Sequence, residues 1–247
     1  MPLKGSGFLA LWNDFDPARE AEYECWHTFE HVPERVGVAG FLSGRRYRAA
    51  ERAEGRYFTL YELEGLAALD GPDYADVVAR PTEWSLSMRP SFRNFHRAPC
   101  ETLSTAGAGR GGCIGTMGFE VLGKLPDAGT TLFAPLSAAL LETAGITSLH
   151  LGEVDPSDLF PLQRTPAVRA PGNTAYVLLV EGTLRAGLDR AESRIREVLL
   201  RSGVSVDGVV WATFDLASAI DRSDLPGSGG RQPARPDLRF RHQGKQD

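Results

Sequence analysis

The sequence predicts an α+β protein built from two consecutive ferredoxin-like βαββαβ units. Strand-like and helix-like segments follow one another in this order in the first half of the 247 residues, and again in the second half. A Gly- and Ala-rich segment, residues 105–111, separates the halves and has the composition of a flexible linker. We therefore expect one unit over residues 1–104 and a second over residues 112–220.

The first unit begins with a short apolar run that is typical of a buried strand. A helix is predicted to start at Asp16–Pro17, because Asp caps helix N-termini and Pro is tolerated at the first helical position. Pro33 is expected to end or kink this helix. Its expected apolar face comprises Ala21, Cys25, Phe29 and Val32. The predicted elements are strands at 8–13, 41–48, 56–62 and 92–103, the helix at 18–33 and a broken helical region at 65–88.

The second unit repeats this order without obvious residue identity to the first. Its predicted elements are strands at 113–121, 146–153, 174–180 and 207–215, and helices at 131–143 and 184–201. Residues 221–247 contain Pro, Gly, Arg and Gln with almost no apolar content, so we expect a disordered tail.

Composition excludes several classes of protein. The formal net charge of −5 gives no reason to expect a nucleic acid or an anionic membrane as partner. No apolar stretch approaches the roughly 18 residues of a membrane span, and residues 1–5 lack the apolar core of a signal peptide. The three cysteines, Cys25, Cys100 and Cys113, form no CxxC pair. A reducing cytoplasm is the expected setting.

The topology predicts a cavity. In a βαββαβ unit the helices cover one face of the sheet and leave the other bare. We expect the two bare faces to pack against each other and to leave a cavity between the units. Polar side chains that point into such a cavity need partners, so they indicate a ligand site.

Two segments of the first unit carry a family resemblance. They are residues 26–35, Trp-His-Thr-Phe-Glu-His-Val-Pro-Glu-Arg, and residues 40–47, Gly-Phe-Leu-Ser-Gly-Arg-Arg-Tyr. With the element order, they resemble the dimeric α+β-barrel superfamily, and within it the EthD-like and related uncharacterised bacterial domains. The resemblance covers residues 7–103, extends to residue 217 by topology, and implies an intramolecular version of that barrel. It also implies a pocket, since members include isomerases, cyclases, cofactor-free monooxygenases, haem enzymes and ligand-binding proteins.

Four polar residues form one stripe of the first helix, at i, i+3, i+4 and i+7. They are His27, Glu30, His31 and Glu34. We predict that His27 or His31 lines the cavity as a general acid or base, and that Glu30 orients its imidazole. The alternative is a solvated polar face of the helix.

The segment His27–His31 also fits the H-x-x-E-H pattern of zinc hydrolases. A zinc site needs a further protein ligand, and no matched third ligand is found in the sequence. We therefore predict no metal, with a metal-binding variant as an alternative.

Arg45 and Arg46 are neighbours on a predicted strand, so their side chains point to opposite faces. One of these side chains must be buried, and burial of its charge costs free energy unless the guanidinium meets an anion. We predict that one arginine holds the carboxylate or phenolate of a substrate. The alternative is a structural ion pair with Glu30 or Glu34. Further predicted substrate-binding residues are Asn13, Tyr47, Trp84, Arg93 and Asn94.

These residues predict a small-molecule enzyme without an organic cofactor. It would use histidine acid–base chemistry, as an isomerase, lyase or cyclase, on a small aromatic or ring-derived organic acid. The alternatives are a non-catalytic ligand-binding or interaction module of the same fold, and a haem- or metal-binding variant. The expected partner is the small-molecule substrate, and a second copy of the chain, in a homodimer, is an open alternative.

Overall fold

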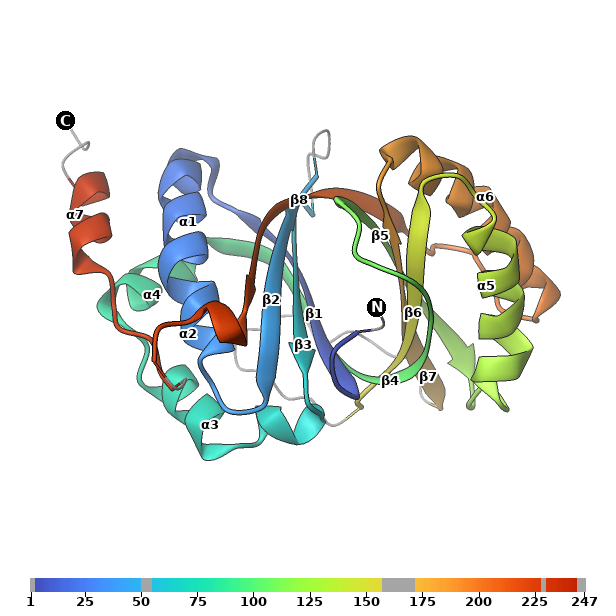
Figure 1. Cartoon of the computed structure of the whole chain (residues 1–247), viewed down its shortest axis with the longest axis horizontal. Coiled ribbons are helices and arrows are strands. Elements are labelled where there is room, and N and C mark those ends of the chain that lie inside the picture. Colours follow the sequence, from blue (N-terminus) through green and yellow to red (C-terminus); the bar gives the residue numbers. More distant parts are fainter. Residues whose placement is uncertain (1–2, 50–54, 157–171, 228–229, 244–247) are drawn as a thin grey trace.

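The computed structural model describes residues 3–49, 55–156, 172–227 and 230–243. The eight strands of these residues form one closed barrel in the order β1-β3-β2-β8-β5-β7-β6-β4, with helices outside it (Figure 1). The strands are β1 (Gly7–Phe15), β2 (Phe41–Arg48), β3 (Tyr57–Leu63), β4 (Phe92–Gly107), β5 (Cys113–Leu122), β6 (Ile146–Val154), β7 (Asn173–Gly182) and β8 (Trp211–Asp221). The helices are α1 (Glu20–Trp26), α2 (Val32–Val36), α3 (Pro72–Ala79), α4 (Glu83–Met88), α5 (Ala134–Leu141), α6 (Arg185–Arg201) and α7 (Pro236–Gln243). None of the described helices is long and apolar enough to cross a membrane.

Each half supplies four neighbouring strands of the barrel. The halves join at two antiparallel seams, where β2 pairs with β8 and β4 pairs with β6. The predicted tandem ferredoxin-like architecture is confirmed. Residues 105–107 of the expected linker belong to β4, where Thr105 pairs with His150 across the seam. The strand expected at 207–215 instead begins at Trp211 and continues to Asp221.

The interior of the barrel is filled with side chains. Every strand contributes to one apolar cluster, whose largest members are Phe8, Phe58, Tyr47, Phe214 and Leu179. Beside this cluster, Arg45 lies between two buried carboxylates, at 3.1 Å from Glu62 and 2.9 Å from Glu181. The bare faces do meet as expected, with buried side chains of both halves between them, and the cavity that the predicted histidines line lies on the other face of the sheet.

The first helix continues past Pro33 because it changes its winding. Residues His27–His31 form a π-helical turn, in which the Val32 N–H donates to the carbonyl of His27, five residues back. Pro33 has no N–H to donate to the preceding turn. The wider π-helical turn lets the chain continue without that hydrogen bond, and α2 then runs to Val36. Short π-helical turns of this kind occur frequently at functional sites.

The predicted apolar face of this helix is right at Val32, which is 2% exposed, but wrong at Phe29. Phe29 is 54% exposed, whereas Glu30 and Glu34 on the polar stripe are 2% and 0% exposed. Tyr23 and Trp26 lie on the same side as that stripe and are fully buried, so these two large aromatic side chains decide which face meets the sheet.

The predicted disordered tail is also wrong for the described residues 222–227 and 230–243. Helix α7 lies beside α1 (Figure 1), and Leu238 packs in a cluster with Trp26 and Trp84. Arg231 donates to Glu34 at 2.9 Å and to Asp76 at 3.0 Å. The low apolar content of this segment misled the prediction, because ion pairs with carboxylates of the first half hold it in place.

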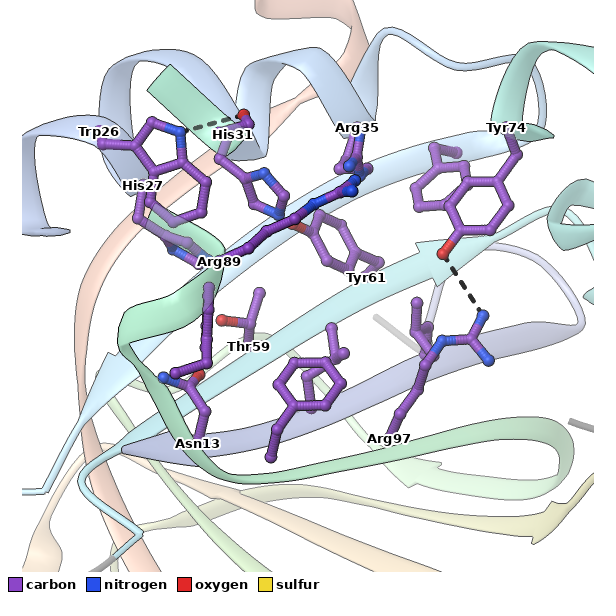
Figure 2. Close-up of a pocket in the computed structure, with 16 residues that line it drawn as sticks. Asn13, Trp26, His27, His31, Arg35, Thr59, Tyr61, Tyr74, Arg89 and Arg97 are labelled. Carbon is purple, nitrogen blue, oxygen red and sulfur yellow. Dashed lines mark hydrogen bonds between the residues drawn. The ribbon is translucent and has the colours of Figure 1, made fainter. Parts of the chain in front are cut away.

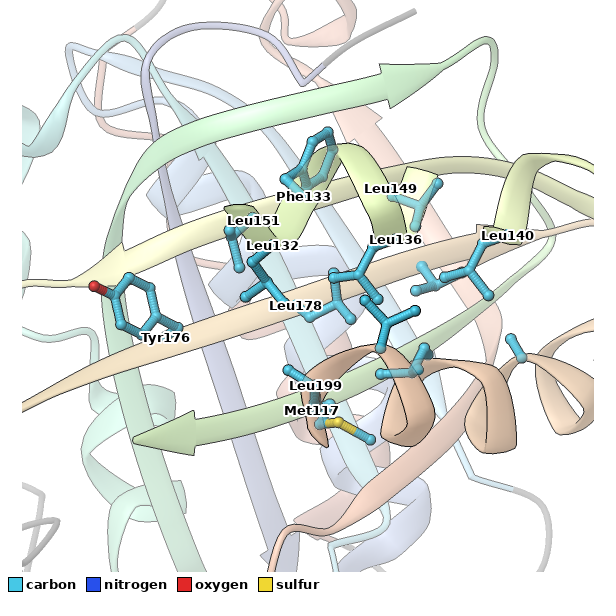
Figure 3. Packing of buried hydrophobic residues seen from close by; sticks show 14 of the residues in the cluster. Met117, Leu132, Phe133, Leu136, Leu140, Leu149, Leu151, Tyr176, Leu178 and Leu199 are labelled. Atoms are coloured by element: carbon cyan, nitrogen blue, oxygen red, sulfur yellow. The ribbon is translucent and has the colours of Figure 1, made fainter. Parts of the chain in front are cut away.

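The second half has a dense apolar core between its helices and its sheet. Leucine side chains from α5, α6, β6 and β7 meet there, together with Met117 of β5 (Figure 3). Leu132, Leu136 and Leu178 are fully buried. This core occupies the place that a cavity takes in the first half.

Candidate functional site

A cavity lies between the helices and the outer face of the sheet in the first half (Figure 2). Strands β1, β3 and β4 form its floor, and the π-helical turn with α2 forms its roof. Its volume is about 70 Å³, and it is partly open to solvent. A space of this size holds the reacting end of a small molecule, or a handful of waters.

His27 and His31 both reach this cavity from the roof. Their imidazoles stack with ring centroids 5.1 Å apart and an interplanar angle of 26°. His27 is 4% exposed and stacks on Tyr23 on its other side, at 5.0 Å, while His31 is only partly buried. The Nδ1 atoms of both rings are buried without a hydrogen-bond partner among the described residues. Of the two, His31 is therefore the ring available to a ligand.

The surroundings keep both imidazoles neutral. Burial, the positive charge of Arg46 and the neighbouring His31 lower the pKa of His27 well below its ordinary value of 6.5. Burial and the charges of Arg35 and Arg89 lower the pKa of His31 in the same way. At neutral pH each ring therefore has a free lone pair and can accept a proton.

Three arginines, Arg35, Arg89 and Arg97, line the cavity, and no Asp or Glu side chain of the described residues does. Arg97 donates to the Tyr74 hydroxyl at 3.4 Å. The Tyr61 hydroxyl is buried without a hydrogen-bond partner in the described part of the chain, and burial raises its pKa. The cavity thus combines a positive potential with aromatic and aliphatic walls, which suits an anionic organic ligand.

Of the other predicted site residues, all of which the structure describes, only Asn13 lines the cavity. Its amide exchanges hydrogen bonds with the Tyr23 hydroxyl at 3.3 Å, below the stacked imidazoles.

Glu30 does not orient an imidazole. Its Oε1 accepts from the Thr82 hydroxyl at 2.5 Å, and its Oε2 accepts from the Arg235 backbone N–H at 2.6 Å. The carboxylate therefore ties the π-helical turn to α4 and to the C-terminal segment. The prediction that Glu30 fixes the histidine tautomer is wrong.

Neither predicted arginine reaches the cavity. Arg45 points into the barrel, where it meets two carboxylates and donates to the Tyr47 hydroxyl at 3.0 Å. Arg46 points to the helices and pairs with Glu24 at 3.0 Å. Both form structural ion pairs, although with other partners than the alternative named. The prediction of an anion clamp at Arg45 or Arg46, and of Tyr47 as a cavity residue, is wrong.

The remaining predicted contacts also lie elsewhere. Trp84 is buried under α7 and donates to Glu22 at 2.9 Å. The Arg93 side chain is 64% exposed. Asn94 donates to Asp14 at 2.8 Å. These three residues shape the rim of the first half and do not line the cavity.

The sequence reasoning missed the arginines that do line it. Arg35 belongs to the segment that carries the family resemblance, and its place one turn after His31 was the signal available. Arg89 and Arg97 come from a turn and from β4, far along the chain. Nothing in their local sequence distinguishes them from exposed arginines.

The H-x-x-E-H pattern does not assemble a metal site. Its glutamate is turned away from the histidines, and the residues the structure describes contain no group of three or more His, Cys, Asp or Glu side chains that could hold a metal ion.

No protein-family model matches the chain, and no curated protein matches it in sequence. Several known structures share its fold. An anthrone oxidase-like protein superposes with a TM-score of 0.63 at 10% identity, covering 91% of this chain and 97% of that one. A mutant chlorite dismutase from Candidatus Nitrospira defluvii gives 0.53 at 8% identity, covering 86% and 92%. A heme-binding protein from Thermus thermophilus gives 0.50 at 12% identity, covering 91% and 95%. At these identities the likeness shows the fold alone.

A haem does not fit the cavity of this chain. Haem binding requires an axial ligand that faces a wide slot. Here His27 and His31 stack on each other, and Phe92 and Phe95 close the opposite side of a space of about 70 Å³.

Proposed function

We propose that the protein is an enzyme that moves a proton on a small, ring-containing organic acid, with His31 as the proton acceptor. The supporting observation is the pair of stacked imidazoles, held neutral in a partly apolar cavity without a hydrogen-bond partner for Nδ1 among the described residues. A buried polar group without a partner lowers stability, so its presence favours a functional role.

In the proposed step, neutral His31 takes a proton from the carbon next to a substrate carbonyl. The electron pair of the broken C–H bond moves onto the carbonyl oxygen and forms an enolate, and His31 becomes an imidazolium. Burial and the arginines oppose a positive charge on His31, but the adjacent enolate compensates it as it forms. Return of the proton to the enolate oxygen gives the enol tautomer, and in a substrate with a conjugated C=C bond its return to the far carbon of that bond completes a double-bond isomerisation.

His27 is proposed as a positioning residue. It lies between His31 and Tyr23, with stacked rings on both sides, and is itself almost fully buried. This packing fixes the plane of the His31 ring relative to the floor of the cavity.

The fold of the anthrone oxidase-like protein favours a second candidate reaction with the same first step. The enolate would react with dioxygen instead of a proton. One oxygen atom would become a new carbonyl at the deprotonated carbon, and the other would leave as water. No further reductant is needed for this balance, because the substrate carbon supplies the electrons.

Solvent deuterium exchange separates these proposals. A panel of ring-containing keto acids, beginning with phenylpyruvate, is incubated in D₂O and followed by NMR, with oxygen uptake recorded in parallel. We expect the protein to accelerate exchange at the carbon next to the carbonyl, and His31→Gln to reduce the rate about 10²- to 10⁴-fold.

His96→Gln is the matched control, because His96 is exposed on β4 and outside the cavity. Oxygen uptake linked to His31 would favour the oxidase reaction over the isomerase. Binding of a panel acid without exchange or oxygen uptake would identify a ligand-binding module instead. Exchange that is unchanged in His31→Gln would contradict the proposal.

A further inference from the structure

The side chains of Arg35 and Arg89 converge beside His31 (Figure 2). Arg35 comes from α2 in the roof, and Arg89 comes from the turn that follows α4. The two guanidinium groups are close enough for the charge of Arg35 to contribute, after burial, to a lowered pKa of Arg89. Two like charges that face one space repel each other unless an anion lies between them.

The carboxylates of the protein do not balance this pair. Arg35 contacts the Glu34 carboxylate at 3.0 Å, but the same carboxylate also binds Arg231 at 2.8 Å. Arg89 donates to the backbone carbonyl of Val78 at 3.0 Å and makes no ion pair within the described part of the chain. Arg35 therefore shares its carboxylate with a third arginine, and Arg89 makes no direct ion pair among the described residues, although the negative charge of Glu34 also acts on it.

Unused polar atoms surround the same space. Tyr61 on β3 is 2% exposed, and its hydroxyl has no hydrogen-bond partner among the described residues. The Nδ1 of His31 is likewise buried without a partner there. Buried polar groups are normally satisfied, so their position around one cavity indicates a polar ligand.

Arg97 serves the cavity differently. It lies on β4 toward the opposite end of Figure 2, beside Tyr74 of α3, to which it donates a hydrogen bond. Arg35 and Arg89 therefore bring two guanidinium groups, with one shared carboxylate, to the end of the cavity near His31. The floor of the cavity is largely apolar, with Leu9, Leu11 and Phe92.

We infer that Arg35 and Arg89 together hold the carboxylate of an aromatic carboxylic acid, with its ring against the apolar floor and its anionic group beside His31. Guanidinium groups bind carboxylates through paired hydrogen bonds, which lysine cannot reproduce. The role of the bound acid as a substrate rests on the proposed function. The binding of the acid by the two arginines does not depend on it.

Binding of the acid has a consequence for His31. The charged groups that act on this ring are Arg35 from α2, Arg89 from the turn after α4 and Arg46 from β2, and the titratable ring stacked on it is His27. A carboxylate between the first two offsets their charge and raises the proton affinity of His31. The base would become stronger when the substrate is in place.

Calorimetric titration with benzoate tests the inference, with the uncharged benzamide as the matched ligand. We expect the protein to bind benzoate at least about tenfold more tightly than benzamide. Arg89→Gln should weaken benzoate binding about 10- to 100-fold, as expected for a charged hydrogen bond. Arg93→Gln, at an exposed arginine near by in sequence, should leave binding within about twofold. NMR should show the His31 pKa rising when benzoate binds.

Thermal unfolding of each variant shows that a loss of binding is not a loss of fold. Arg35→Lys, which keeps a charge beside buried Glu34, should bind benzoate with intermediate affinity. The inference is overturned if benzoate does not bind, if benzamide binds equally well, or if Arg89→Gln binds benzoate like the parent protein. His31→Gln should still bind benzoate, so a variant that retains both binding and proton exchange would contradict the proposed function and leave the clamp intact.

Discussion

At one place the two halves of the barrel have the same backbone structure, but the space beneath it is lined by polar side chains in one half and filled by apolar side chains in the other. In each half, a five-residue π-helical turn is followed by a proline at the second position of the next helix: His27–His31 before Pro33, and Gly129–Phe133 before Pro135. Under the first turn lies a cavity with polar walls. Under the second lies a continuous apolar core (Figure 3).

Equivalent positions show how the contents differ. His31 of the first turn corresponds to Phe133 of the second, and Glu34 corresponds to Leu136. On the sheet, Asn13 pairs with Tyr57, where Phe119 pairs with Tyr176. The second half shows that the fold needs no polar groups here. Those of the first half therefore reflect a selected function better than a requirement of folding.

The largest expected effect is in the apolar core of the second half. Leu136→Ala should lower the free energy of unfolding by about 2–5 kcal/mol, because it leaves a cavity among fully buried leucines. His31→Ala in the first half opens onto an existing cavity and should cost about 1 kcal/mol or less. Urea unfolding of both variants measures the difference. Equal losses of unfolding free energy in the two variants would contradict the difference between the halves.

The order of elements and the barrel could be predicted from sequence, because strand and helix periodicities depend on local patterns. The location of the cavity could not. Whether the barrel interior is full depends on how Phe8, Phe58 and Phe214 interlock across both halves, which no single segment encodes. The sequence also favoured the wrong face of the first helix, where Tyr23 and Trp26 outweigh the smaller residues opposite.

The second-largest expected change in the free energy of unfolding concerns the C-terminal segment. Leu238→Ala should lower the free energy of unfolding by about 2 kcal/mol, because Leu238 is 9% exposed against the roof of the first half. Phe240→Ala is the matched control, since Phe240 is 70% exposed and should change stability by less than about 0.5 kcal/mol. Chemical denaturation of both variants checks this. If the two changes cost the same, the segment does not pack as described.

The site residues were predictable only in part. His27, His31 and Asn13 reach the cavity, as the helix stripe and the end of the first strand indicated. Arg35 comes from α2, whereas Arg89 and Arg97 come from the turn after α4 and from β4, far along the chain, so their position around one cavity depends on tertiary structure. Arg45 and Arg46 were expected in their place, but carboxylates of the protein pair with both.

The pH dependence of stability should reflect the two histidines. Their pKa values are lowered in the folded protein, so between the ordinary 6.5 and the folded-state values the unfolded chain binds more protons. Stability should therefore fall as the pH is lowered through this window, by at most about 1.4 kcal/mol per pH unit for each histidine. Unfolding experiments from about pH 7 down to about pH 5, the range in which an unperturbed histidine titrates, measure the slope. A slope that is unchanged in His31→Phe would contradict the lowered pKa of His31.

The same property shifts the expected pH–rate profile. An ordinary histidine would place the acidic limb near neutral pH. With the pKa of His31 lowered, the limb of the free protein should lie below 6.5. The profile of kcat/KM for proton exchange with phenylpyruvate reports the free protein, and a limb there at or above that ordinary value would assign the chemistry to another group.

One variant tests the central claim directly, namely that the first half gives up stability for chemistry at His31. His31→Phe introduces the residue that the second half carries at the equivalent position. We expect the free energy of unfolding to rise by about 0.5–2 kcal/mol, while proton exchange falls about 10²-fold or more. A variant that is less stable than the parent protein and retains its exchange activity would contradict the claim.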